Sequence, residues 1–397
     1  MEVDPFRIHV EGAVLDDLAA RLRRARWSEG GDGAGWARGT RPAYLRALVE
    51  TWLGAYDWRA HEAEINALPQ FIAPIHDARD GARIHFVHAR GNGPSPTPLL
   101  LLHGWPDSFL RFRKVLPLLA DGYDVVVPSL PGFAFTGAVR RGEGERPARV
   151  TARLLWKLMT ESLGYDRFAV AGGDGGSVIA QILAIEHPEA VIGIHLTDLG
   201  WHALNVDPAT VSRPERKFLE AVHKAQMADG AYALVQMTTP RSLASALADS
   251  PVGLASWIVD RFHSWVDGDL DAVIGRQDLL TDITLYWVTQ TIGASILNYY
   301  AEARSPSLTT RDRVTVPVGL LLGPAEPGGI PPRAFAERTL AVRHWTELPR
   351  GGHFLPLEQP AAYARDVIDF FQPLLAPAPL PRGSRPDLSR EAAHGIR

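Results

Sequence analysis

The chain has 397 residues, a formal net charge of −4 and 46% hydrophobic residues. This is ample apolar material for a large core, and the nearly balanced charge gives no reason to expect a nucleic-acid partner. The absence of cysteine excludes disulfides, zinc–thiolate sites and a thiol nucleophile. Residues 1–22 lack the apolar run of a signal peptide, and no stretch reaches the ~18–20 apolar residues of a membrane span. We therefore expect a soluble, cytoplasmic protein without a membrane span.

The period of the apolar pattern changes along the chain. Apolar residues recur at helical spacing up to residue 66, so residues 1–70 are predicted to form an N-terminal helical segment. From residue 71, short apolar runs alternate with amphipathic stretches, as in an α/β fold with helices flanking a mostly parallel sheet. The runs predict an eight-stranded sheet, with strands near 72–75, 84–88, 99–102, 125–127, 168–171, 192–196, 316–322 and 344–348.

The alternation stops between residues 199 and 312, where the sequence is helical in pattern and rich in Trp and Tyr. Because this segment interrupts two core strands, we expect a helical lid over the carboxyl edge of the sheet, where ligands bind in α/β folds. The core would then comprise residues 71–198 and 313–375. Residues 376–397 are rich in Pro, Arg and Ser and are predicted to be a disordered tail.

A glycine-rich turn, Gly172-Gly173-Asp174-Gly175-Gly176, follows the predicted strand at 168–171 and precedes a predicted helix. This order is that of the nucleophile elbow of the α/β-hydrolase fold, in which a strained turn exposes the nucleophile beside a helix N-terminus. Here the apical residue is Asp174. A carboxylate needs no base to become a nucleophile, and it forms an ester when it displaces a leaving group at a saturated carbon.

Two other interpretations of this turn are a phosphate-binding loop and a plain turn. A dinucleotide-binding fingerprint does not fit, because its glycine spacing differs and the turn here follows a late strand. The strand–turn–helix context favours the nucleophile.

Two backbone N–H groups are candidates for an oxyanion hole. The strand at 99–102 ends in His103-Gly104-Trp105-Pro106, at the position where this fold supplies one of these donors. We predict that the N–H groups of Trp105 and Gly175 stabilise the oxyanion formed when the Asp174 ester is hydrolysed. His103 itself is interpreted as structural.

A base and an orienting acid should follow later strands, in the chain order nucleophile, acid, histidine. His353 follows the last predicted strand in Gly351-Gly352-His353-Phe354 and is well placed to activate water. Glu326, after the strand at 316–322, is the preferred acid. Asp198, after the strand at 192–196, is the alternative, since some relatives of this fold use that position.

Several segments together resemble the epoxide hydrolases of the microsomal type, which include juvenile-hormone and bacterial branches. The resemblance extends from about residue 5 to residue 375 and suggests a soluble bacterial member. It implies that the chain adds water to an epoxide to give a vicinal diol, with no metal or organic cofactor, and that a homodimer is possible. The segments that carry it are Asp57-Trp58-Arg59, Leu68-Pro69-Gln70-Phe71, His103-Gly104-Trp105-Pro106, Ser129-Leu130-Pro131-Gly132-Phe133, Asp249-Ser250-Pro251-Val252-Gly253-Leu254 and Gly351-Gly352-His353-Phe354.

The resemblance further implies two lid tyrosines that bind the epoxide oxygen and protonate it as it leaves. Tyr232 matches one of them, and Tyr299 matches the other better than its neighbour Tyr300 does. The chain departs from the family at two places. Gly175 stands where a bulky residue is usual, and the loop that begins at Glu326 is one residue longer.

Two alternative functions remain at this point. A haloalkane dehalogenase would use the same Asp and His, but it commonly needs an indole N–H next to the nucleophile, and Gly175 has no side chain. A non-hydrolytic relative would use the lidded pocket to bind a ligand or to direct a cyclisation.

Overall fold

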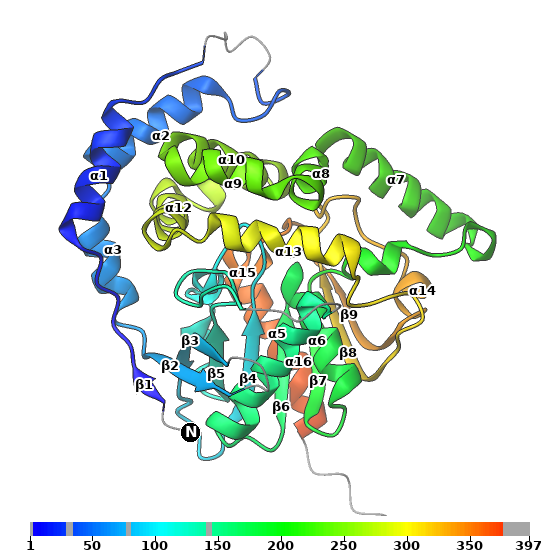
Figure 1. Ribbon diagram of the computed structural model, residues 1–397. Coiled ribbons are helices and arrows are strands. Elements are labelled where there is room, and N and C mark those ends of the chain that lie inside the picture. The colour runs from blue at the N-terminus through cyan, green and yellow to red at the C-terminus, as the bar shows by residue number, and fades with distance from the viewer. Residues whose placement is uncertain (1–2, 29–34, 77–80, 140–144, 376–397) are drawn as a thin grey trace, which may run out of the picture.

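A nine-stranded sheet runs through the centre of the computed structural model (Figure 1), which describes residues 3–28, 35–76, 81–139 and 145–375. The strand order is β1-β2-β3-β5-β4-β6-β7-β8-β9. Pairing is antiparallel from β1 to β5 and parallel from there to β9. The strands are β1 (Asp4–Pro5), β2 (Gln70–Ile75), β3 (Ala82–Ala89), β4 (Thr97–Leu102), β5 (Tyr123–Pro128), β6 (Phe168–Gly172), β7 (Val191–Leu196), β8 (Val314–Leu322) and β9 (Leu340–Glu347).

The α/β fold and its mostly parallel sheet are confirmed, but the predicted number of eight strands is wrong. The ninth strand, β1, has only two residues, which pair with Ile72 and Phe71 of β2, so it leaves no apolar alternation in the sequence. The last strand, β9, also begins earlier than predicted. It is an edge strand in which Arg343 is exposed, so its first half lacks the continuous apolar run of a buried strand.

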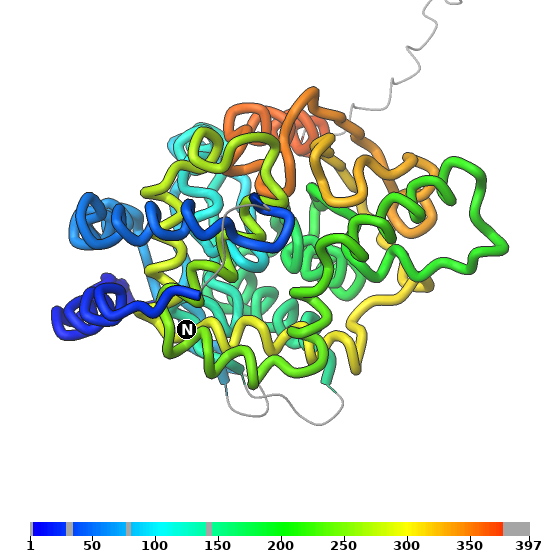
Figure 2. Tube along the Cα trace, turned by 90° about the horizontal axis from the view of Figure 1, so that it is seen from above, coloured from blue at the N-terminus to red at the C-terminus, as the bar shows by residue number. Residues whose placement is uncertain are grey.

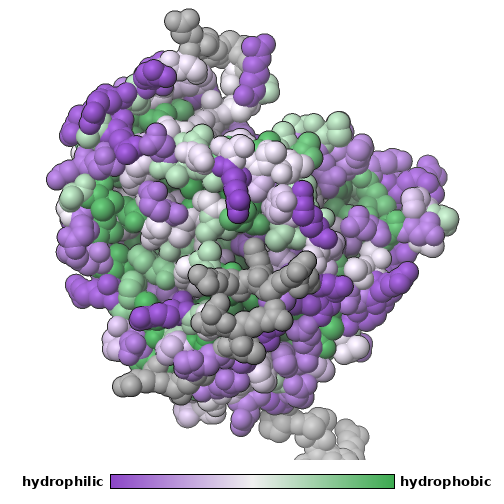
Figure 3. Space-filling model, viewed as in Figure 1, coloured by the Kyte–Doolittle hydropathy of each residue, from purple (hydrophilic) through white to green (hydrophobic). Residues whose placement is uncertain are grey.

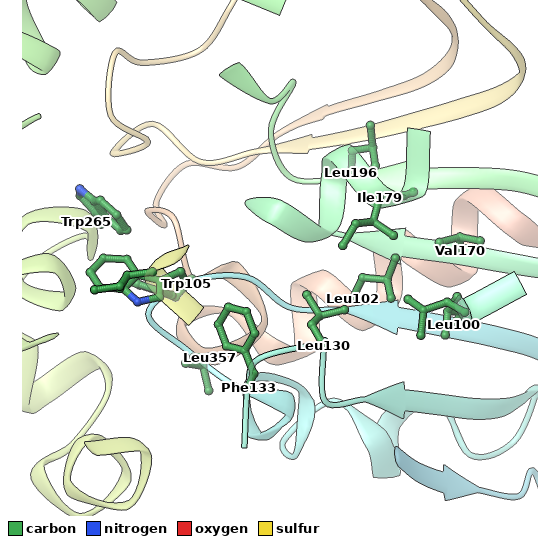
Figure 4. Close-up of a cluster of buried hydrophobic side chains, with 14 of the residues drawn as sticks. Leu100, Leu102, Trp105, Leu130, Phe133, Val170, Ile179, Leu196, Trp265 and Leu357 are labelled. Atoms are coloured by element: carbon green, nitrogen blue, oxygen red, sulfur yellow. The ribbon is translucent and has the colours of Figure 1, made fainter. Parts of the chain in front are cut away.

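Helices cover both faces of the sheet. On one face lie α5 (Pro147–Lys157) and α6 (Gly175–Glu186), and on the other lie α4 (Leu116–Leu119) and α16 (Pro360–Leu375). Because both faces are covered, the inner parallel strands are mostly apolar, and two separate buried clusters form. Figure 4 shows part of the larger cluster. Leu100, Leu102 and Val170 lie along the strands, whereas Trp105 and Trp265 lie beyond the strand ends.

An N-terminal group of helices runs along one side of the molecule, up to the helices above the sheet (Figures 1 and 2). It consists of α1 (Gly12–Arg23), α2 (Pro42–Gly54) and α3 (Trp58–Ile65). The Trp52 indole N–H in α2 donates a 3.0 Å hydrogen bond to Thr284 Oγ1 in α12 (Arg276–Thr289). This segment is therefore packed against the helices above the sheet.

A helical insert lies between β7 and β8 and covers the carboxyl ends of the parallel strands (Figure 1). Its helix α7 projects from the side opposite to the N-terminal helices (Figure 2). The insert comprises the short helices η4 (Trp201–Leu204) and η5 (Pro208–Thr210), then α7 (Arg213–Asp229), α8 (Ala231–Thr238), α9 (Pro240–Asp249), α10 (Pro251–Trp265), α11 (Leu270–Val273), α12 and α13 (Ile292–Arg304).

The remaining short elements are η2 (Phe109–Phe112), the π-helical turn η3 (Leu158–Ser162), α14 (Arg333–Ala336) and α15 (Leu355–Glu358). Within the described ranges, no single helix is long and apolar enough to cross a membrane. Only α9 and α10 taken together, bent by 119°, meet the criterion of length and composition. The predicted disordered tail, 376–397, lies outside the described residues.

Candidate active site

Asp174 sits at the apex of the sharp turn between β6 and α6. Its φ of 56° is in the left-handed region, which costs a non-glycine residue about 1–3 kcal/mol. The turn is possible only because its glycines let backbones approach closely. A Cβ on Gly172 would lie 2.6 Å from the Gly176 carbonyl oxygen, and one on Gly176 would lie 2.3 Å from that of Leu102. The strained turn therefore holds the Asp174 carboxylate at the carboxyl end of the sheet.

The loop after β4 brings a backbone donor to this carboxylate. The Trp105 N–H donates a 2.9 Å hydrogen bond to Asp174 Oδ1, and the Gly175 N–H also bonds the carboxylate. The preceding residue must be glycine, because a Cβ on Gly104 would lie 2.2 Å from Asp174 Oδ1. The two N–H groups predicted for the oxyanion hole thus both meet the Asp174 carboxylate.

His353 lies on the loop after β9, with one ring nitrogen toward each of two carboxylates. Its Nε2 is 3.5 Å from Asp174 Oδ2, and its Nδ1 is 3.1 Å from each carboxylate oxygen of Glu326. Backbone bonds fix the loop, since the His353 N–H donates to the Trp265 carbonyl at 2.8 Å. The imidazole of His353 thus lies between the carboxylates of Asp174 and Glu326.

The loop that carries Glu326 turns at two glycines. Gly328 and Gly329 have φ of 92° and 78°, values that only glycine adopts readily, so the loop turns back on itself. At its start, Gly323 packs so closely on the histidine loop that a Cβ there would lie 2.3 Å from the Gly351 carbonyl oxygen. This contact places Glu326 beside His353.

Asp198, the alternative acid, makes different contacts. Its Oδ2 accepts the Asp174 backbone N–H at 2.6 Å, and its Oδ1 accepts the Ser177 hydroxyl at 2.6 Å and the Gly200 N–H at 2.9 Å. Burial raises the pKa of Asp198 to about 6, and the nearby charge of Glu326 adds to this rise. Asp198 therefore braces the nucleophile turn, whereas Glu326 contacts the imidazole.

Opposing effects set the charges of the pair formed by Asp174 and His353. Burial favours the neutral form of Asp174, but His353, 3.5 Å away, together with the N–H groups of Trp105 and Gly175, lowers its pKa overall. Burial also disfavours the imidazolium, yet the carboxylates of Glu326 and Asp174, one on each side of the ring, raise the pKa of His353 well above its usual value. The resting site therefore holds a carboxylate beside an imidazolium.

Tyr232 and Tyr299 come from two helices of the insert and meet over Trp105. The Tyr232 ring stacks on the Trp105 indole, with 5.5 Å between centroids and an interplanar angle of 4°. Tyr299 meets the same indole edge-on at 5.9 Å, and its ring lies 6.1 Å from that of Tyr232. Burial raises the pKa of both phenols, and the Asp174 charge adds to this rise, so both keep their protons at neutral pH. Two O–H donors thus lie near the nucleophile.

A cavity of about 280 Å³ extends from the nucleophile toward the surface. Asp174, His353, Glu326 and Tyr232 line its inner end, and apolar side chains of α7, such as Phe218 and Val222, line the outer part. On the face shown in Figure 3, apolar residues gather beside α7 amid hydrophilic ones. Within the described part of the chain, no group of three or more His, Cys, Asp or Glu side chains is arranged so that it could hold a metal ion.

Gly175, where the sequence departs from the family, borders open space. A Cβ added there would meet no atom within 4 Å, and its φ is not in the left-handed region. The geometry of the turn therefore does not require glycine at position 175. The absence of a side chain leaves room next to Asp174.

The sequence analysis missed a buried ion pair behind the site. Arg111, only 1% exposed, binds Asp107 Oδ2 at 2.7 Å and donates to the His353 carbonyl at 2.7 Å. Asp107 Oδ1 in turn accepts the Gly104 N–H at 3.1 Å. The pair joins the oxyanion loop to the histidine loop. Its only signal in the sequence is the spacing of four between opposite charges next to apolar residues.

Comparisons with known proteins agree with this geometry. Residues 3–112 match the family model "Epoxide hydrolase N terminus", and residues 97–256 match "alpha/beta hydrolase fold". A predicted epoxide hydrolase of Stigmatella aurantiaca is 35% identical over 94% of this chain and 86% of its own length. Epoxide hydrolase 1 of Oryctolagus cuniculus is 30% identical over 93% of this chain and 88% of its own length.

The crystal structure of juvenile hormone epoxide hydrolase from Bombyx mori superposes with a TM-score of 0.84 at 26% identity, covering 94% of this chain and 95% of that one. The epoxide hydrolase of Aspergillus niger gives 0.81 at 26% identity, covering 94% and 97%. The resemblance seen in the sequence is thus confirmed over nearly the whole chain. The chain belongs to the epoxide hydrolase family, with the α/β-hydrolase fold.

Proposed function

We propose that this epoxide hydrolase opens its substrate through a covalent ester on Asp174, with His353 as base, Glu326 as its orienting acid, and Tyr232 and Tyr299 as donors to the epoxide oxygen. The observation that carries the proposal is that the two oxygens of the Asp174 carboxylate have different partners. Asp174 Oδ1 binds the Trp105 N–H at 2.9 Å, whereas Oδ2 is turned toward His353 Nε2 at 3.5 Å. One oxygen is thus held, and the other faces the base.

In the first step, Asp174 Oδ2 attacks one ring carbon while the C–O bond to the epoxide oxygen breaks. That oxygen leaves as an alkoxide, a poor leaving group, so the O–H groups of Tyr232 and Tyr299 lower the barrier by hydrogen bonding and proton donation. Because Asp174 is already an anion, this step needs no base.

In the second step, water attacks the carboxyl carbon of Asp174. The ester no longer carries the Asp174 charge, so one of the two anions that hold the proton on His353 is lost and the pKa of the imidazole falls. The imidazolium passes its proton to the tyrosine that protonated the epoxide oxygen, and the neutral His353 then accepts a proton from water. Meanwhile Oδ1 becomes an oxyanion between the N–H groups of Trp105 and Gly175. Release of the vicinal diol regenerates the carboxylate.

The cavity supports a small-molecule epoxide with an apolar substituent. Its outer wall is apolar, and the space beside Gly175 leaves room near the attacked carbon. The helical insert, which supplies Tyr232 and Tyr299, is proposed to act as the lid that excludes water from the first step.

The proposal is tested by trapping the ester. His353→Gln retains the nucleophile but loses the base, so incubation with styrene oxide should add the mass of one epoxide to the peptide that contains Asp174. Asp174→Ala, treated in the same way, is the control and should remain unmodified. An unmodified His353→Gln protein that still binds styrene oxide would show that the ester mechanism is wrong.

We also propose that the enzyme works in the cytoplasm, and that the N-terminal helices α1 to α3 allow a homodimer. They lie along one side of the molecule (Figure 2), where a second chain has access. Cell fractionation tests the location, and light scattering of the purified chain tests the dimer.

A further inference from the structure

The buried cation Arg261 lies next to the proposed proton donor. Arg261 belongs to α10 and is only 4% exposed. Its guanidinium carbon is 4.8 Å from the centroid of the Tyr232 ring and 5.7 Å from that of Trp265. The Trp105 indole stacks on the same ring. A buried arginine thus contacts a group that the proposed reaction deprotonates.

Hydrogen bonds hold the guanidinium in this place. One nitrogen donates to the Asp229 carbonyl at 2.9 Å, another lies 2.7 Å from Asp229 Oδ1, and Asp260 also binds it. The carboxylates of Asp229 and Asp260 are partly exposed, so water screens their charges more than it screens the buried guanidinium against the ring. The charge of Arg261 therefore lowers the pKa of Tyr232 by more than the charge of Asp229 raises it.

Tyr232 and Tyr299 differ in whether a cation lies over the ring. In the part of the chain that the structure describes, no Arg or Lys side chain lies over the Tyr299 ring, whereas the neighbouring ring of Tyr300 has Arg304 over it. Burial raises the pKa of both phenols. Of the two, Tyr232 is the phenol whose pKa the charge of Arg261 lowers. Tyr232 is thus the phenol whose anion is better stabilised.

From this arrangement we infer that Arg261 is a positioning residue that makes Tyr232, rather than Tyr299, the donor of the proton to the epoxide oxygen. The inference rests on the proposed function of Tyr232. As Asp174 attacks, the C–O bond breaks, its electron pair goes to oxygen, and the Tyr232 proton moves to that oxygen. The Tyr232 phenolate regains its proton from the His353 imidazolium, and the neutral imidazole is protonated again by the water that attacks the ester in the second step. The sum is one epoxide plus one water giving one diol.

The timing of the charge movement explains why Arg261 accelerates this step. Before attack the negative charge is on Asp174, and after attack it is on the epoxide oxygen and on the Tyr232 phenolate. The guanidinium stays over the phenol throughout, so it stabilises the later charge distribution more than the earlier one. Only such a differential interaction lowers the barrier.

The test is a double-mutant cycle on the rate of ester formation. Ester formation with styrene oxide is followed in single turnovers by tryptophan fluorescence, since Trp105 and Trp265 flank the site. R261Q removes the charge but can still bond the Asp229 carbonyl, and it should slow ester formation roughly 10-fold, as expected for a buried cation–π contact. R261K should restore most of the rate, because it restores the charge. Ester hydrolysis should change little.

The second half of the cycle tests through which tyrosine Arg261 acts. In a Y232F background, R261Q should have no further effect, whereas in a Y299F background it should again cost roughly 10-fold. Equal effects of R261Q in all three backgrounds, or an R261K as slow as R261Q, would overturn the inference. Should R261Q fail to fold, R261M, which keeps the apolar stem, replaces it in the same cycle.

The cycle also separates the two claims. If Y232F slows ester formation but R261Q does not, the role of Arg261 is wrong and the proposed function stands. If Y232F leaves ester formation unchanged, the proposed role of Tyr232 is wrong, and the inference falls with it.

Discussion

The Trp105 N–H donates a 2.9 Å hydrogen bond to Oδ1 of Asp174 in the resting enzyme. The proposed nucleophile is therefore already bound to the proposed oxyanion donor before the substrate arrives. In the proposed mechanism, the same donor positions the carboxylate for attack and later stabilises the oxyanion on the same oxygen. This explains how one preorganised group serves two steps.

Gly104→Ala should selectively disturb the hydrogen bond between the Trp105 N–H and the Asp174 carboxylate. The added Cβ would lie 2.2 Å from Asp174 Oδ1, so the carboxylate must move. We expect the rate of ester formation to fall about 100-fold or more, because a displacement of about 1 Å costs this much. Single-turnover kinetics with styrene oxide measure the rate.

Gly175→Ala is the matched control. Its Cβ meets no protein atom and its N–H is kept, so the carboxylate stays in place and ester formation should fall far less than in Gly104→Ala. Replacing glycine at this helix start should raise the free energy of unfolding by about 0.4–1 kcal/mol. Equal losses of rate in the two variants would show that the contact between Gly104 and Asp174 is unimportant.

Glu326→Gln should affect the second step. Without the carboxylate, the imidazolium is less stable and is poorly oriented, so we expect ester hydrolysis to slow roughly 10²- to 10⁴-fold and the ester to accumulate. Quenched-flow mass spectrometry measures the ester. Asp198→Asn is the comparison, and it should destabilise the turn at Asp174 without accumulation of ester. The reverse result would make Asp198 the acid.

The pH dependence of stability should report the charge on His353. Its pKa is raised in the folded state, so its contribution is fully present below the unfolded-state pKa of about 6.5 and is lost as the pH rises through the higher folded-state value. Urea unfolding of wild type and His353→Gln should therefore show a larger difference at pH 6 than at pH 9.5. A difference that is independent of pH would contradict a buried imidazolium.

Arg111→Met should destabilise the enzyme by about 3–5 kcal/mol, because it leaves Asp107 buried without its partner. The double variant Asp107→Asn, Arg111→Met should lose less, since it removes both charges and an asparagine Oδ1 can still accept the Gly104 N–H. Urea unfolding of Arg111→Met, Asp107→Asn and the double variant measures the changes. If the double variant lost as much as the sum of the two single ones, the coupling across this pair would be absent.

Local patterns predicted much of the fold and the site. The elbow at Asp174 and the loop at His353 are marked by local glycine patterns, and strands buried on both faces are visible as apolar runs. The strand β1 escaped detection because two residues cannot show a period. The choice between Glu326 and Asp198 was open for a different reason. Both follow strands at the same sheet edge, and only the packing of Gly323 on the histidine loop separates them.

Long-range electrostatic contacts were beyond the reach of the sequence. Arg111 meets the His353 carbonyl across 242 positions, and Arg261 meets Tyr232 through the packing of α10 on the neighbouring helices. An arginine on an amphipathic helix is usually solvated, so neither position carries a signal of burial. Such contacts depend on how helices pack, and no local period encodes that.

The most direct test of the ester on Asp174 is a single turnover in ¹⁸O-labelled water, with enzyme in excess over styrene oxide. If Asp174 is the nucleophile, the first diol takes its oxygen from the carboxylate, so the diol should be unlabelled and the Asp174 peptide should gain one ¹⁸O. A diol that carries the label in the first turnover, with an unlabelled Asp174 peptide, would mean that water attacks the epoxide directly and would contradict the mechanism.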